Sequence, residues 1–120
     1  MMQETNDLLG KVLLIGITFL DREKKLIEQY QTYGKIVKAD ADGIGVERQN
    51  EKELFMLPPA FDNIQPARPG EYRLRSTGEV VINPDYLTSW TLNDTTDELV
   101  ENHKKRGFHG FQQSEENPGL

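Results

Sequence analysis

A short acidic segment of the chain has residue types that could bind a metal ion. Asp40, Asp42 and Glu47 surround Gly43, a pattern that resembles half of a calcium-binding loop. A complete loop needs alternating oxygen ligands and a final bidentate glutamate, whereas this segment continues into Ile44 and an apolar run. Asp-Gly is also a turn signal, because glycine adopts positive φ without a steric cost. We therefore predict a hairpin turn here and no metal site.

Groups for nucleophilic or histidine-dependent catalysis are sparse. His103 and His109 are the only histidines, and their spacing does not match the i, i+4 spacing of two metal ligands on one helix. Ser76, Ser89 and Ser114 stand in turn or tail contexts, and no G-x-S-x-G motif is present. The chain has no cysteine, so thiolate nucleophiles are absent. The sequence therefore predicts a protein that is not an enzyme and holds no cofactor.

The net charge indicates which class of partner to expect. The chain has 20 acidic and 14 basic residues and a formal charge of −6. Such a chain repels a nucleic-acid backbone on average and attracts a cationic protein. We therefore expect a basic protein partner and no nucleic acid. The predicted contact residues are carboxylates on two polar turns, namely Asp40, Asp42, Glu47, Glu51 and Glu53. Further carboxylates follow in the C-terminal segment, at Asp94, Asp97, Glu98 and Glu101.

The first residues do not have the pattern of a secretory signal. The segment MMQETNDLLGKVLLIGITF places acidic residues before its apolar run and has no basic region. The longest apolar run, Val12 to Leu20, is interrupted by Gly16 and Thr18 and is far shorter than the about 20 residues of a membrane-spanning helix. We expect a cytoplasmic protein that does not enter a membrane.

Short apolar runs separated by turn signals predict the elements that position these side chains. Extended segments are expected at 11–19, 26–39, 44–48, 54–57, 71–75, 80–83 and 86–90. The segment 22–33 also fits helical spacing, but an extended conformation is preferred because Gly34 and the residues after it continue the extended pattern. The predicted fold class is all-β, a small antiparallel barrel of about six short strands with a helical or disordered C-terminal tail.

The most clearly patterned segment is PGEYRLRSTGEVVINPDYLTSW, residues 69–90. Its alternation places Tyr72 and Leu74 on one face of a strand and the neighbouring arginines on the other. We interpret it as the closing hairpin of the barrel. In the strand that follows, Tyr86 and Trp90 share one face, and large aromatic side chains are common in interfaces as well as in cores. These two residues complete the predicted partner-binding set, at the rim of the barrel.

The boundary between domain and tail is expected near Leu92. Residues 1–92 form the predicted barrel domain, and residues 93–120 form an acidic and then basic tail with a short helix at 96–106. Thr95 and Glu98 fit a capping box, and Gly107 is placed to end the helix. Phe108 and Phe111 are expected to dock on the barrel.

Four segments resemble parts of SH3-like and Sm-like small barrels: GKIV at 34–37, DGI at 42–44, FMLP at 55–58 and PGEY at 69–72. The likeness lies in strand lengths and turn spacing over residues 10–90. In size and acidity the chain is also similar to the small immunity proteins that bacteria make against polymorphic or contact-dependent toxins. That resemblance implies a cytoplasmic, non-catalytic inhibitor that caps a toxin domain, often a basic nuclease.

Three hypotheses about function follow. The first is a protein-binding module, most concretely an immunity-type inhibitor of a cationic toxin. The second is an Sm-like RNA-binding barrel, in which aromatic and basic side chains stack on and neutralise single-stranded nucleic acid; its residues would be Tyr72, Arg73, Arg75 and Tyr86. The third is a small hydrolase or ligand-binding barrel, since the sequence does not reveal the interior.

Overall fold

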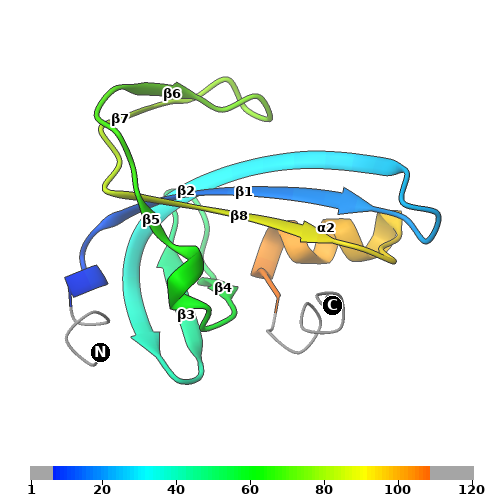
Figure 1. Ribbon diagram of the computed structural model, residues 1–120, viewed down its shortest axis with the longest axis horizontal. Helices are drawn as coiled ribbons and strands as arrows, with labels where there is room; N and C mark the ends of the chain where they lie inside the picture. Colours follow the sequence, from blue (N-terminus) through cyan, green and yellow to red (C-terminus); the bar gives the residue numbers. More distant parts are fainter. Residues whose placement is uncertain (1–6, 109–120) are drawn as a thin grey trace.

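The central strand of the main sheet is β1, which pairs with neighbours of opposite direction on its two sides. Residues 7–108 are described in this computed structural model. β1 is antiparallel to β2 and parallel to β8, and the order across the sheet is β4-β3-β2-β1-β8-β5 (Figure 1). The strands are β1 (Val12–Leu20), β2 (Leu26–Asp40), β3 (Gly43–Glu47), β4 (Phe55–Leu57), β5 (Gln65–Pro66), β6 (Glu71–Arg73), β7 (Val80–Ile82) and β8 (Tyr86–Leu92).

The prediction of a closed antiparallel barrel is wrong, and so is the resemblance to SH3-like and Sm-like barrels. A barrel needs hydrogen bonds between its first and last strands, whereas β4 and β5 form opposite borders of an open, mixed sheet. After β4 the chain crosses to the far side of β1 through the short 3-10 helix η1 (Phe61–Asn63) and β5. β8 consequently enters beside β1 in the parallel direction.

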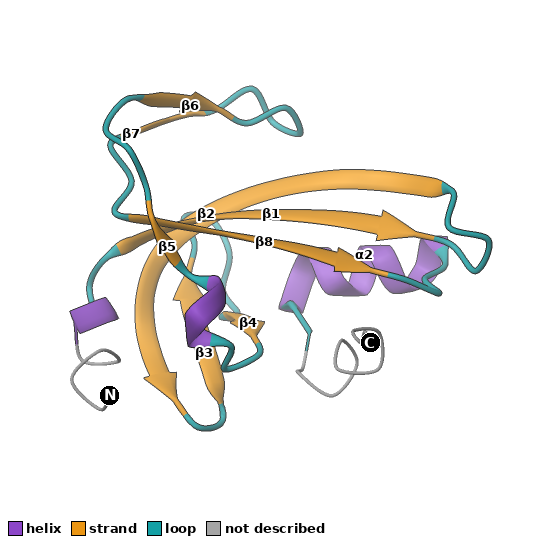
Figure 2. Cartoon of the chain, in the orientation of Figure 1, coloured by secondary structure: helices purple, strands orange, loops and turns teal. Residues whose placement is uncertain are grey.

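The hairpin β6–β7 does not close the sheet but forms a separate two-stranded sheet over one of its faces (Figure 2). Leu74 and Val81 are buried and form a small core with Leu14 of β1. Tyr72 packs against the same cluster, and its hydroxyl donates to the carbonyl oxygen of Arg68 at 2.8 Å. Tyr72 and Leu74 therefore face inward, as the alternation of the sequence indicated, but they face the sheet and not a barrel interior.

The opposite face of the sheet carries the main core and the helix α2 (Asp97–Arg106) (Figure 2). Alternate residues of β1 supply its centre, because successive side chains of a strand point to opposite faces. The fully buried members are Leu13, Ile15, Ile17, Phe19, Ile36, Ile44, Val46, Phe55, Leu57 and Val100. Thr96 is the N-cap of α2, and its hydroxyl accepts from the backbone N–H of Leu99 at 3.2 Å, so the N-cap lies one residue after the predicted Thr95.

The folded unit extends beyond Leu92. Val100 of α2 is 1% exposed and Phe108 is 2% exposed, and both belong to the main core. The hydroxyl and the backbone N–H of Thr95 both donate to the carbonyl oxygen of Leu20, at 2.7 and 2.9 Å, which ties the start of this segment to the end of β1. Residues 93–108 are therefore part of the domain, and Phe108 docks on it. Phe111 and His109 lie outside the described residues.

The segment for which a helix was an alternative is the long strand β2. Its first half pairs with β1 up to Lys35, and its second half pairs with β3 from Lys35 to Asp40. Gly34 lies where the two pairings meet: a Cβ there would collide with the carbonyl oxygen of Glu47 and lie 2.7 Å from Val46 Cγ1. Glycine at this position lets β3 approach β2 closely.

Candidate functional site

The outer edge of the first half of β2 is open. No strand of the described chain pairs with this side of β2 before Lys35. Ser76, from the tip of the β6–β7 hairpin, occupies one position on the edge. Its hydroxyl donates to the carbonyl oxygen of Gln31 at 2.9 Å and accepts from the N–H of Gln31 at 3.3 Å. Unpaired strand edges can accept a strand from another protein, and a side chain that blocks the edge limits this pairing.

A notch of about 330 Å³ lies along this edge, between the hairpin tip and the loop after β3. Two acidic residues line it, Glu51 from the loop and Glu79 from the hairpin, and both are exposed. Within residues 7–108 neither carboxylate takes part in an ion pair. The complete lining is Tyr30, Gln31, Thr32, Tyr33, Arg48, Gln49, Asn50, Glu51, Thr77 and Glu79.

Arg48 forms the inner end of the notch and is 6% exposed. Its Nη1 donates to the hydroxyls of Tyr30 and Thr32, at 3.1 and 3.3 Å. The same guanidinium donates to the carbonyl oxygens of Lys104 and Lys105, at 3.2 and 3.0 Å. These carbonyls lie at the C-terminal end of α2, where the helix dipole is negative, so the helix end replaces a carboxylate as the partner of this buried charge.

Four hydrogen bonds of the Arg48 guanidinium are therefore made to groups of the protein itself. Its Cζ also lies 4.5 Å from the centroid of the Phe55 ring, a favourable cation–π geometry. Since Glu51 and Glu79 are the other ionised groups of the notch, the surface that the notch offers to a partner is acidic.

A second cation, Lys104, supports the same corner. Its ammonium group lies 2.9 Å from Glu28 Oε2 and 3.5 Å from Glu101 Oε2. The hydrogen bond to Glu28 raises the pKa of Lys104 above its ordinary value of 10.5, against the opposing effect of partial burial. Lys104 also lies 5.3 Å from the centroid of the Tyr30 ring. β2 and the last turn of α2 are thus joined by ionic and hydrogen-bonded contacts beside the notch.

The structure separates the two predicted acidic turns. Asp40 and Asp42 lie at the turn between β2 and β3, whereas Glu47 is the last residue of β3 and Glu51 and Glu53 follow it. The two groups therefore lie at opposite ends of β3 and do not form one patch. Glu47 is exposed at the last position of β3, and only Glu51 belongs to the notch.

Several of these carboxylates already have cationic partners. Lys38 Nζ lies 3.0 Å from Asp40 Oδ2 and 3.9 Å from Asp42 Oδ2. The hydrogen bond from Lys38, followed by that from the N–H of Asp42, lowers the pKa of Asp40 below its ordinary value of 3.8. Glu53 lies 3.5 Å from Nε of Arg106.

Tyr86 and Trp90 are half-buried on the core side of β8 and do not form an exposed rim. The Trp90 ring meets Phe108 edge to face at a centroid distance of 5.3 Å. Tyr86 packs against the main core near Leu8 and Phe61. Both residues contribute ring surface to the core, which is the alternative role of such aromatic side chains.

The residues of the RNA-binding hypothesis are not brought together. Tyr72 packs beneath the hairpin, and Tyr86 lies on the opposite face of the main sheet. Arg73 is exposed on the outer side of β6. With the Sm-like barrel also absent, a continuous basic and aromatic stripe does not form from these four residues.

Sequence reasoning missed Arg48 and the notch itself, and it did not place Glu79 in the partner-binding set. The partners of Arg48 are backbone carbonyls of α2, and a backbone group leaves no residue-type signal in a sequence. Glu79 and Glu51 line the same notch because the hairpin tip lies beside β2, an arrangement that joins segments far apart in the sequence. The exposed polar pair Gln49-Asn50 beside Glu51 was the available local signal of a loop at this position.

Within residues 7–108, no group of three or more metal-ligating side chains is arranged to hold a metal ion. The helices of this part of the chain are too short or too polar to cross a membrane. No protein-family model, curated protein or solved structure matches the chain.

Proposed function

We propose that the protein is a non-catalytic module that binds a cationic protein partner through the notch beside β2. The observation that carries this proposal is the pair Glu51 and Glu79. Both residues are exposed, both line one notch, and neither has an ion-pair partner among the described residues.

The chemistry of the notch suits a lysine or arginine side chain. A guanidinium or ammonium group between two carboxylates forms charge-assisted hydrogen bonds, which are about twice as strong as neutral ones. Arg48 also lines the notch, but its donors are directed to the end of α2, whose negative dipole offsets part of its positive charge. The two carboxylates outnumber it, so the notch keeps a net negative charge. The overall charge of −6 adds long-range attraction for a cationic partner.

The open edge of β2 supports the same proposal. An extended segment of a partner can hydrogen-bond to the free backbone groups of an edge strand, while its side chains enter adjacent pockets. The notch lies directly against this edge. Inhibition of a cationic toxin is one function of this class; that identification remains a prediction based on net charge.

Peptide display tests the proposal and does not require an identified partner. A library of random extended peptides is selected against the intact chain, and the selected peptides are expected to be enriched in lysine and arginine. Binding should weaken at least about tenfold in the double variant Glu51→Gln/Glu79→Gln, which corresponds to about 1.4 kcal/mol. It should also weaken as salt rises.

The matched control is Asp62→Gln/Glu71→Gln, which removes the same charge from exposed positions outside the notch. If the selected peptides lack basic residues, or bind both double variants equally, the notch is not the binding site for a cationic partner. Circular dichroism of each variant would show that the fold is retained.

A further inference from the structure

On the face of the main sheet beneath the hairpin, β1 is covered by apolar side chains in one part and open in the next. Leu14 lies under Leu74 and Val81. The next residues of β1 on the same face are Gly16 and Thr18, which the hairpin leaves uncovered. A cavity of about 550 Å³ opens above them. We call this cavity the trough.

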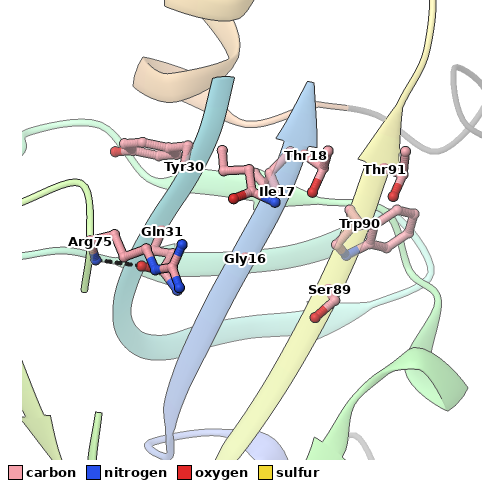
Figure 3. A pocket seen from close by; sticks show the side chains of 10 residues that line it. Gly16, Ile17, Thr18, Tyr30, Gln31, Arg75, Ser89, Trp90 and Thr91 are labelled. Atoms are coloured by element: carbon pink, nitrogen blue, oxygen red, sulfur yellow. Dashed lines mark hydrogen bonds between the residues drawn. The ribbon is translucent and has the colours of Figure 1, made fainter. Parts of the chain in front are cut away.

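Six polar or side-chain-free positions form the floor of the trough in two rows across three strands (Figure 3). Gly16 pairs with Gln31 of β2 and Ser89 of β8, and Thr18 pairs with Gln29 and Thr91. Because paired residues share a face of the sheet, their side chains point to the same side. The floor therefore offers hydroxyl and amide groups.

Neither the backbone conformation nor crowding by neighbouring atoms requires a glycine at position 16. It does not have the positive φ that favours glycine, and the nearest atom to an added Cβ would be Ser89 Oγ at 4.0 Å. Glycine weakens a strand interior, and it often marks a place where a ligand approaches the backbone closely. The position would accommodate a larger residue, so the missing side chain keeps the middle of the floor open.

Two of the three strands under the trough, β1 and β8, are also parallel. All-parallel sheets are usually covered on both faces, whereas in this mixed sheet the part of the pair under the trough is covered only on the α2 side.

Arg75 is the single charged residue that lines the trough. The hairpin tip holds it at the border of the cavity: its backbone N–H donates to Gln31 Oε1 at 2.6 Å, and the adjacent Ser76 bonds to the backbone of Gln31 (Figure 3). Although the chain has a net negative charge, the charged part of this lining is therefore positive.

We propose that the trough binds a small, hydroxyl-rich ligand that carries a carboxylate or phosphate group. The anionic group pairs with the guanidinium of Arg75, which suits carboxylate and phosphate geometry. The hydroxyl groups of the ligand exchange hydrogen bonds with Thr18, Ser89 and Thr91 and with the amide of Gln29, all of which line the cavity. The open surface above Gly16 lets the ligand lie against the sheet.

Backbone NMR spectra during titration test this proposal. The probes are glucose 6-phosphate and gluconate, which present a phosphate and a carboxylate on similar polyhydroxyl frameworks. At least one of them is expected to shift the amide signals of Gly16, Thr18, Ser89 and Arg75. Comparing the two shows which anionic group the trough prefers. Glucose has the hydroxyl groups without the anionic group, and inorganic phosphate has the anionic group without the polyhydroxyl framework. Each should bind at least about tenfold more weakly than the better probe.

Three variants separate a specific site from general charge effects. Arg75→Gln should weaken binding at least about tenfold, whereas Arg73→Gln, which removes the same charge from the outer side of β6, should leave it unchanged. Gly16→Val should abolish binding while thermal stability is kept or raised, since valine favours strands and has space here.

Absence of shifts at these amides with both probes overturns the proposal. Equal binding of inorganic phosphate would mean an adventitious ion only, and equal binding of glucose would show that the charge is not used; either result also rejects it. Glu51 and Glu79 do not line the trough, so this result is independent of peptide binding at the notch.

Discussion

Nη2 of Arg48 lies 3.0 Å from the carbonyl oxygen of Lys105, so a buried guanidinium directly after β3 donates a hydrogen bond to the C-terminal end of α2. With Lys104 accepting a second hydrogen bond from the same group, two otherwise unpaired helix carbonyls are satisfied. This contact joins the helix to the sheet and fixes one wall of the notch.

Replacing Arg48 with methionine should destabilise the protein by about 2–4 kcal/mol, because buried carbonyl and hydroxyl groups lose a charged donor. Arg48→Lys should recover only part of this loss, since one ammonium group cannot match the forked guanidinium. Urea denaturation measures both changes. Arg73→Met, at an exposed position, is the control and should change stability by less than about 0.5 kcal/mol. A loss below about 1 kcal/mol for Arg48→Met would contradict the role assigned to this contact.

Gly107 should tolerate alanine much less well than Gly78, although the two have nearly the same φ, +84° and +81°. The positive φ disfavours alanine at both positions, and with ψ at −155° Gly107 has a backbone conformation that essentially only glycine adopts. At Gly107 an added Cβ would also collide with the carbonyl oxygen of Met56 and lie 2.6 Å from the Met56 nitrogen, whereas at Gly78 no atom lies within 4 Å. The loss for Gly107→Ala should therefore exceed about 3 kcal/mol. Thermal unfolding of both variants tests this expectation. Equal decreases in Tm for Gly107→Ala and Gly78→Ala would contradict it.

The carboxyl group of Asp40 should titrate below 3.8 in the folded protein and return toward that value in Lys38→Met, because the hydrogen bond from Lys38 is the main cause of its lowered pKa. A carboxyl whose pKa is lowered by folding stabilises the folded state above its unfolded-state pKa. That contribution disappears as the pH falls through the lower folded-state pKa.

The stability difference between wild type and Asp40→Asn should therefore shrink between about pH 5 and about pH 2. Carbon-detected NMR follows the titration, and urea denaturation at each pH follows the stability. Asp62→Asn, at an exposed position on η1, is the control for removal of a carboxylate. An Asp40 pKa that does not change in Lys38→Met would show that the ion pair is not formed in solution.

Ser76→Ala should loosen the hairpin tip and expose the edge of β2. The variant loses both hydrogen bonds to the backbone of Gln31, with an expected cost of about 0.5–1.5 kcal/mol. Hydrogen exchange at the Gln31 amide should become faster than in wild type. Thr77→Val is a suitable control, because the hydroxyl of Thr77 bonds only within the tip, to Glu79. Unchanged exchange at Gln31 in Ser76→Ala would show that the hydrogen bonds of Ser76 do not hold the hairpin tip on β2.

Local patterns in the sequence indicated where α2 and the strands other than β5 lie. Alternation placed Tyr72 and Leu74 on the inner face of their strand, and basic residues before Gly107 marked the end of α2. These signals are local because side-chain direction in a strand and the satisfaction of helix ends depend on residues a few positions apart.

Only the tertiary structure decided the order of the strands and the surfaces between them. Leu14 and Gly16 lie on the same face of β1, yet one is covered by the hairpin and the other is open. The parallel pairing of β1 with β8, the placement of Glu51 and Glu79 in the lining of one notch and the burial of Arg48 against α2 likewise join distant parts of the chain. Such contacts depend on which apolar faces pack together, and residues far apart in sequence leave no shared local period that would reveal this choice.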